Sequence, residues 1–144
     1  MAPNTTPIFT VLAQLAQLAE DDKSDVQAAV AGNESTPSGV LAQLAEDDQI
    51  YLRYSAAGNE STPSEALELL AKDTNKDVRA EVAANKNSPS EALEVLAKDD
   101  KSYVRYLVAA NKNSPSEALE VLAKDPDKDV QETAKKMLAT RQLT

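Results

Sequence analysis

The chain has 144 residues and a net charge of −9, and it contains neither cysteine nor histidine. This length allows one domain with a continuous core. Without cysteine there are no disulfides and no thiolate metal sites, and without histidine the usual neutral-pH general base and the commonest metal ligand are missing. The acidic charge disfavours nucleic acid, which binds clustered Lys and Arg, and it disfavours anionic membranes. We therefore expect a soluble, cytoplasmic protein without a cofactor.

The sequence repeats itself every 26 residues, as the spacing of Pro37, Pro63, Pro89 and Pro115 makes plain. A fixed period of this size indicates a solenoid of stacked repeats. We predict a single all-α domain over residues 1–144, an α-solenoid with five two-helix repeats. The predicted units are an N-terminal cap at 1–14 and repeats at about 11–36, 37–62, 63–88, 89–114 and 115–140.

The first predicted helix is longer than its counterparts and carries additional apolar residues, Ile8, Phe9, Val11 and Leu12. The end of a solenoid needs such a variation, because the terminal repeat has a neighbour on one side only. We interpret these residues as part of the N-terminal cap.

Within one repeat, taken from Ser88 to Ser114, the pattern predicts two short helices. Ser88 to Glu91 has the form of a capping box, in which the serine hydroxyl accepts a backbone N–H. Leucines and alanines at helical spacing then predict a first helix to about Lys98. After a polar turn, two valines four residues apart predict a second helix, ended by Asn111 in the left-handed conformation. Neither helix is long enough to be stable alone, so each must pack against neighbouring repeats.

The last segment departs from the repeat. Residues 130–141 predict a longer helix with a charged outer face, and Lys135 and Lys136 replace two small residues of the preceding repeat. This pattern is typical of a C-terminal cap that closes the core against water.

The repeat resembles that of the leucine-rich repeat variant family. The match rests on an L-x-x-L-A-x-D ending, a D-V-R-x-x-V-A-x-N segment and a proline, carried here by Leu67, Leu70, Ala71, Asp73, Asp77, Val78, Arg79, Val82, Ala83, Asn85 and Pro89. The resemblance implies a right-handed superhelix of helices alternating with short α or 3₁₀ segments, a cousin of armadillo and HEAT arrays. An iron–sulfur cluster known in the family sits on a cysteine module, and this chain has no cysteine. The close similarity among the repeats indicates recent duplication or a designed array.

The repeats differ from one another mainly at the start of the second helix. Residues 63–88 and 89–114 differ at seven positions, of which six lie between 74 and 81 in the first of these repeats. All four tyrosines fall in this window, as two pairs spaced by three residues on one side of a helix. We expect that side to be at least half exposed. Tyrosine and arginine are preferred in binding hot spots, and the proposed contact set is Ile50, Tyr51, Tyr54, Arg79, Tyr103, Tyr106 and Leu107. The alternative is surface variation that packing tolerates.

Three other patterns have structural interpretations. Arg53, Arg79 and Arg105 recur at the repeat period and are expected to pair with acidic turns such as Asp73 or Asp99, although a row of guanidinium groups could also hold an anionic ligand. The recurring asparagines, Asn33, Asn59, Asn85 and Asn111, are expected to satisfy turn backbone groups. The D-x-D-x-D run from Asp125 to Asp129 lacks the later ligands of a calcium loop, so we expect turn and helix-start roles instead.

These observations favour a binding module over an enzyme, since no nucleophile–base constellation and no phosphate-binding glycine loop is present in the sequence. The leading hypothesis is a scaffold that presents the second helices to a protein or peptide. The alternatives are a designed or consensus-like solenoid without a natural ligand, or a unit that forms a homodimer through the tyrosine face.

Overall fold

The computed structural model describes residues 14–18 and 24–143. The described part is helical and has no strand, which confirms the all-α fold class. The predicted N-terminal cap residues Ile8, Phe9, Val11 and Leu12 lie outside the described residues. No helix in the described part is both long enough and apolar enough to cross a membrane.

Two classes of helix alternate along the chain. The first helices are α3 (Ser38–Leu44), α5 (Ser64–Leu70), α7 (Ser90–Leu96) and α9 (Ser116–Leu122). The second helices are α2 (Ser24–Ala31), α4 (Ile50–Gly58), α6 (Lys76–Ala84), α8 (Ser102–Ala110) and α10 (Lys128–Gln142). Successive members of each class begin 26 residues apart, so the period in the sequence is also the period of the fold.

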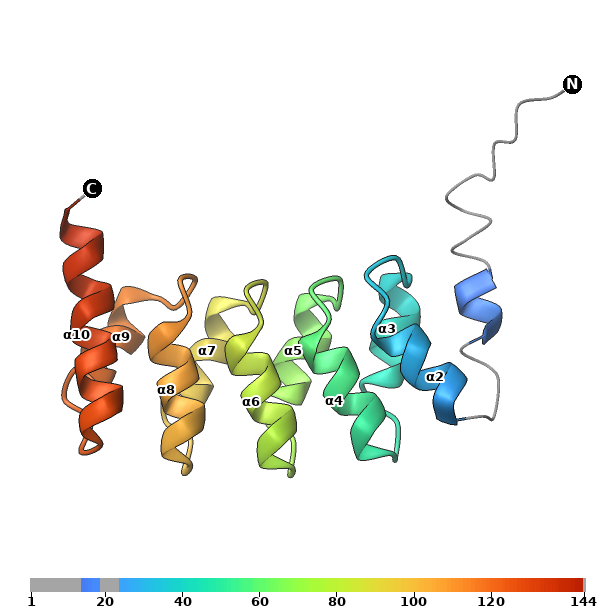
Figure 1. The fold of residues 1–144 in the computed structure, drawn as a ribbon, viewed down its shortest axis with the longest axis horizontal. Helices are drawn as coiled ribbons and strands as arrows, with labels where there is room; N and C mark the ends of the chain where they lie inside the picture. Colours follow the sequence, from blue (N-terminus) through green and yellow to red (C-terminus); the bar gives the residue numbers. More distant parts are fainter. Residues whose placement is uncertain (1–13, 19–23, 144) are drawn as a thin grey trace, which may run out of the picture.

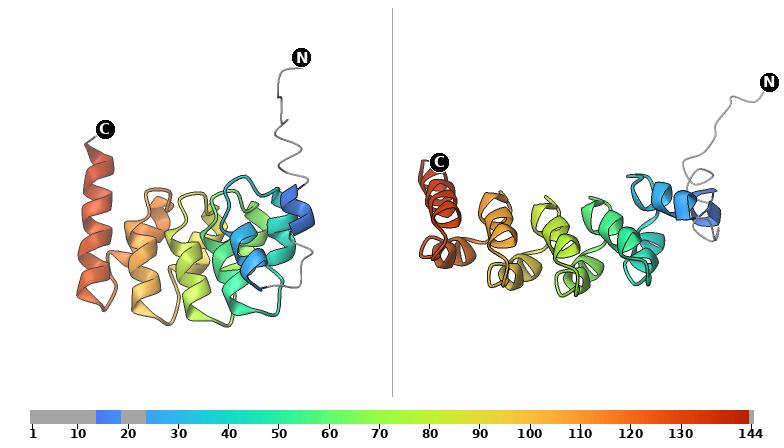
Figure 2. Two further views of the ribbon diagram at one scale, coloured as in Figure 1. Left: turned by 45° about the vertical axis from the view of Figure 1, so that its right-hand side comes forward. Right: turned by 60° about the horizontal axis from the view of Figure 1, so that its bottom comes forward.

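The helix pairs stand side by side in one row, in chain order (Figure 1). The row bends into a shallow arc, and α4, α6, α8 and α10 lie along its inner side (Figure 2). The second helices contact one another more extensively than the first helices do, as expected for the inner side of an arc. The number of repeats and the right-handed sense of the superhelix remain predictions from the sequence.

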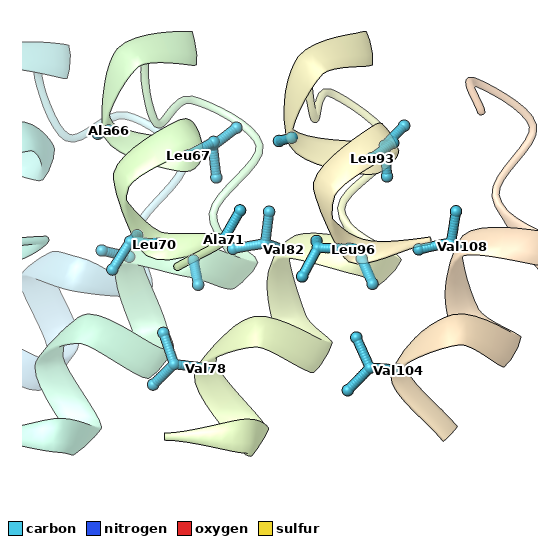
Figure 3. Close-up of a cluster of buried hydrophobic side chains, with 14 of the residues drawn as sticks. Ala66, Leu67, Leu70, Ala71, Val78, Val82, Leu93, Leu96, Val104 and Val108 are labelled. Carbon is cyan, nitrogen blue, oxygen red and sulfur yellow. The ribbon is translucent and has the colours of Figure 1, made fainter. Parts of the chain in front are cut away.

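The core is a continuous layer formed by the apolar positions that recur in each repeat. Leucines of the first helices and valines of the second helices lie between the two rows (Figure 3). These side chains are almost completely buried: Leu67, Leu70, Val78, Val82, Leu93, Leu96, Val104 and Val108. Burying one such side chain contributes about 1.5–3 kcal/mol. The core therefore confirms the predicted stripes and explains why helices of seven to nine residues persist here.

The capping-box prediction is wrong. The backbone of Pro89 is extended, so α7 begins at Ser90, and no side chain caps it. Ser88 therefore lies outside the first turn, and its buried hydroxyl donates a hydrogen bond of 2.5 Å to the carbonyl of Val82 in the preceding helix. The equivalent hydroxyls of Thr36, Thr62 and Ser114 do the same for their own repeats. The Ser or Thr at this repeat position therefore links the end of a second helix to the turn that follows it through a hydrogen bond.

The recurring asparagines are structural, as predicted, but by a different mechanism. Asn85 has φ −71° and ψ 119°, which is extended and not left-handed. Its buried side-chain amide donates to the carbonyls of Ala57 and Asn59 in the preceding repeat, at 2.8 and 3.1 Å. Its Oδ1 accepts the amide of Asn87 at 2.9 Å. Asn59 and Asn111 repeat this arrangement, so the asparagines form a ladder of hydrogen bonds from each repeat back to the previous one.

The C-terminal helix α10 is longer than the other second helices, as predicted, with 15 residues. Lys135 and Lys136 are exposed. Asp127 is the N-cap of this helix and accepts the amides of Asp129 and Val130. Near the other end, Arg141 donates to the carbonyls of the preceding turn, at Lys112 and Ser114. The helix thus closes the end of the row with charged groups that face water.

Candidate binding surface on the second helices

The four tyrosines lie on the second helices α4 and α8, which line the inner side of the arc (Figure 2). Tyr51, Tyr54, Tyr103 and Tyr106 are 38–42% exposed. They are thus surface residues, but the prediction of at least half exposure is wrong. Two of the rings contact carboxylates of a neighbouring repeat: Tyr103 bonds to Asp77 and Tyr54 bonds to Glu81.

The first tyrosine pair forms one wall of a groove between α4 and α6. The groove has a volume of about 530 Å³. Ile50, Tyr51 and Tyr54 line it from α4, and Asp77 and Glu81 line it from α6. Ile50 is 49% exposed, so this side of the groove is apolar and accessible. An apolar wall thus faces two carboxylates, and the lining contains no cationic side chain.

The second pair forms an equivalent groove between α8 and α10, with a volume of about 420 Å³. Tyr103 and Tyr106 line it from α8. The opposite wall carries Asp127 and, from α10, three more charged residues, Asp129, Glu132 and Lys136. Three carboxylates and one ammonium group leave a net charge of −2, the same as in the first groove.

Hydrogen bonds to carboxylates orient two of the tyrosines. The Tyr103 hydroxyl donates to Oδ1 of Asp77 at 3.1 Å. Partial burial is the main cause that raises the pKa of Tyr103 above its ordinary value, and this hydrogen bond is the second. The pKa of Tyr54 is also raised, mainly because its hydroxyl bonds to the Glu81 carboxylate. Both phenols therefore stay neutral donors at physiological pH.

The predicted pairing of the arginine ladder with acidic turns is confirmed. The Nε atoms of Arg53, Arg79 and Arg105 lie 2.7, 2.6 and 2.8 Å from carboxylate oxygens of Asp73, Asp99 and Asp125. Each aspartate belongs to the following repeat. Burial raises the pKa of Asp99 and Asp125, but hydrogen bonds from the arginine and from a backbone amide outweigh it and bring both pKa values below the ordinary value.

Arg79 and Leu107 are less accessible than the other members of the proposed contact set. The Arg79 side chain is 14% exposed, and its guanidinium already bonds to Asp99, Asp100 and the carbonyl of Asp73. It is part of the framework and is not a free cation facing a partner. Leu107 is half-buried and packs against the core. Ile50 and the four tyrosines remain as the accessible members.

The sequence reasoning missed the carboxylates that face the tyrosines. Residues 26 apart occupy equivalent positions in adjacent repeats and lie side by side in a solenoid. Tyr51, Asp77, Tyr103 and Asp129 are related in this way, so tyrosine and aspartate alternate along the row. We call these four residues the Tyr–Asp column. The repeat offset alone, applied to exposed positions, could have found it.

Another exposed row lies on the first helices, at Leu69, Val95 and Val121. These residues are also 26 apart, but they are aliphatic and nearly invariant between repeats. They provide a reference surface for testing the tyrosines.

No family model matches the chain, and a comparison with curated proteins found no match. Among solved structures, a protein described as a leucine-rich repeat variant with a novel repetitive structural motif superimposes with a TM-score of 0.68. The match has 28% identity and covers 88% of this chain and 50% of that protein. The chain has the fold of a leucine-rich repeat variant. It spans half the length of that protein.

A second solved structure, described as an engineered protein, is similar in fold alone. Its TM-score is 0.56 at 24% identity, and the match covers 90% of this chain and 78% of that one. The resemblance noted in the sequence is thus confirmed at the level of the repeat fold.

Proposed function

We propose that the chain is a non-enzymatic scaffold that binds a protein or peptide along the inner side of the arc, with the tyrosines as anchors. One observation carries the proposal. The positions at which the repeats differ most include the four tyrosines, and these line two open grooves on one side of the row. Side chains that only build the solenoid are nearly constant among the same repeats.

The physical basis is the small loss of conformational entropy when a partner binds to such a surface. Tyrosine offers a large contact area with few rotatable bonds. The helices beneath it are held by the buried core and by both ladders, so the surface is ordered before a partner arrives. Preorganisation of this kind reduces the entropy lost on association.

The test is affinity capture of a partner with wild-type protein and with a variant carrying Tyr→Ala at 51, 54, 103 and 106. We expect the variant to lose the partner and to keep its thermal transition within a few degrees, because none of these side chains belongs to the buried core. The control replaces the aliphatic row Leu69, Val95 and Val121 by alanine and should retain the partner.

Capture that survives in the tyrosine variant would refute the proposal. Light scattering at two concentrations tests the competing function, self-association through the tyrosine face. A dimer that the tyrosine variant abolishes would assign the surface to a second copy of the chain.

A further inference from the structure

We infer that the partner segment is extended and basic, with two arginine-rich sites that occupy the two grooves. This inference rests on the proposed function and specifies its ligand. It starts from the Tyr–Asp column, in which aromatic and anionic side chains alternate from repeat to repeat.

Each groove combines the two groups that recognise a guanidinium. Arginine stacks on the face of an aromatic ring, and its planar fork binds a carboxylate through two hydrogen bonds. In the groove between α4 and α6, Tyr51 and Tyr54 supply the rings, and Asp77 and Glu81 supply the carboxylates. In the groove between α8 and α10, Tyr103 and Tyr106 face Asp129 and Glu132.

The charge of the surface favours the same occupant. Each groove has a net charge of −2 in its lining, and the whole chain carries −9. The arginines of this face do not offset the grooves, because each is paired with its own aspartate in the framework. A cationic segment is thus attracted over a long range and is then held by short contacts.

The two grooves also set the spacing of the ligand. They are two repeats apart, and packed helices lie about 8–10 Å apart, so the groove centres are separated by roughly 20 Å. An extended chain advances about 3.3–3.6 Å per residue, so about six residues span this distance. Two arginine pairs separated by four residues match the span.

The probe is therefore a fluorescein-labelled peptide with two Arg-Arg pairs joined by Gly-Ser-Gly-Ser, titrated with the full chain and followed by fluorescence anisotropy. The comparison peptides carry glutamate in place of arginine, or a single Arg-Arg pair. We expect the two-pair peptide to bind at least fivefold more tightly than the single pair, and the glutamate peptide not to bind. Raising the salt concentration should weaken binding.

A pair of matched variants separates the grooves from net charge. Asp77→Asn with Asp129→Asn removes two charges from the Tyr–Asp column. Glu65→Gln with Glu117→Gln removes two exposed charges from the first helices, at the same 52-residue separation. All four residues lie in the first turn of their helices, so the helix-dipole effects are matched. We expect the column variant to weaken binding of the two-pair peptide about tenfold, and the control variant to weaken it less than twofold.

Equal weakening by the two variants would overturn the inference, because binding would then follow net charge alone. Equal affinity for the two-pair and single-pair peptides would overturn the two-groove arrangement. If wild-type protein ignores the arginine peptides while its captured partner still requires the tyrosines, the basic ligand is refuted and the scaffold proposal stands. If capture does not require the tyrosines, the scaffold proposal itself fails.

Discussion

Replacing Asn85 by alanine should destabilise the solenoid more than any single change at its surface. Asn85 is 5% exposed, and its side chain takes part in three hydrogen bonds, two as donor to the previous repeat and one as acceptor in its own turn. A typical intramolecular hydrogen bond contributes about 1 kcal/mol, and a buried group left without a partner costs about 1–3 kcal/mol. Alanine also leaves the carbonyl oxygens of Ala57 and Asn59 without this donor. We expect a loss of about 3 kcal/mol.

The assay is urea unfolding followed by circular dichroism at the helix band. A shift of the midpoint at constant m-value reports stability, whereas a changed m-value would indicate that part of the row unfolds separately. Asn87→Ala is the matched control, two residues away. Asn87 is exposed and donates one side-chain hydrogen bond, 2.7 Å long, to the carbonyl of Glu60. Its replacement should cost less than about 1 kcal/mol.

Asn85→Asp refines the test. Aspartate keeps an acceptor for the amide of Asn87 but presents oxygen, in place of a donor, to two carbonyl oxygens at 2.8 and 3.1 Å. The aspartate variant should therefore be at least as unstable as the alanine variant. If Asn85→Ala costs no more than Asn87→Ala, the asparagine ladder does not hold the repeats together and the reasoning is refuted.

Three further outcomes follow from the framework. A double-mutant cycle with Arg79→Met and Asp99→Asn should give a coupling energy of about 1.5–3 kcal/mol in urea unfolding, because the pair is short and mostly buried. Because the pKa values of Asp99 and Asp125 are lowered in the fold, their contribution to stability is present above about pH 4 and is lost as the pH falls through the lowered values; urea midpoints between pH 2 and 6 should decrease toward acid. Gly39→Ala should raise stability by about 0.5–1 kcal/mol, since a Cβ there meets nothing within 4 Å and alanine favours the helix.

Each of these has a clear counter-result. The exposed pair Lys86–Glu60, with an N–O distance of 3.2 Å, serves as the control cycle and should couple by less than about 1 kcal/mol; equal coupling in both cycles would contradict the role given to burial. Urea midpoints that stay constant or rise toward pH 2 would contradict the acid prediction. A lower thermal transition in Gly39→Ala would contradict the open space around that position.

Much of the fold could be predicted because the repeats of one chain can be compared with one another. Val78 and Val104 keep their identity at a 26-residue offset, whereas Asp77 and Tyr103 beside them do not. At these positions the contrast distinguished the buried valines from the exposed Asp77 and Tyr103 without any other sequence, and the structure confirms it.

Other details depended on geometry that the residue types do not determine. If the helix started at Pro89, the hydroxyl of Ser88 would accept a hydrogen bond from a backbone amide of the first turn. The helix starts at Ser90, and the hydroxyl instead donates to the carbonyl of Val82. The pattern Ser-Pro-Ser-Glu allows both. Likewise, the exposure of Arg79 depended on whether Asp99 of the next repeat comes within reach, and the structure places it at 2.6 Å. The inner position of the second helices follows from their closer mutual packing, which no single repeat reveals.

The two ladders run in opposite directions, and this gives each of the central repeats a head and a tail. Arginine bonds forward to the next repeat, and asparagine bonds back to the previous one. Such an interface is heterologous, and when the rotation between units does not close a ring it can extend without limit. The charged helix α10, whose Arg141 bonds to the carbonyls of Lys112 and Ser114, forms the face on which a further repeat would pack. A chain cut before Asp127 would lack α10 and would leave α8 without the helix that packs against its outer side.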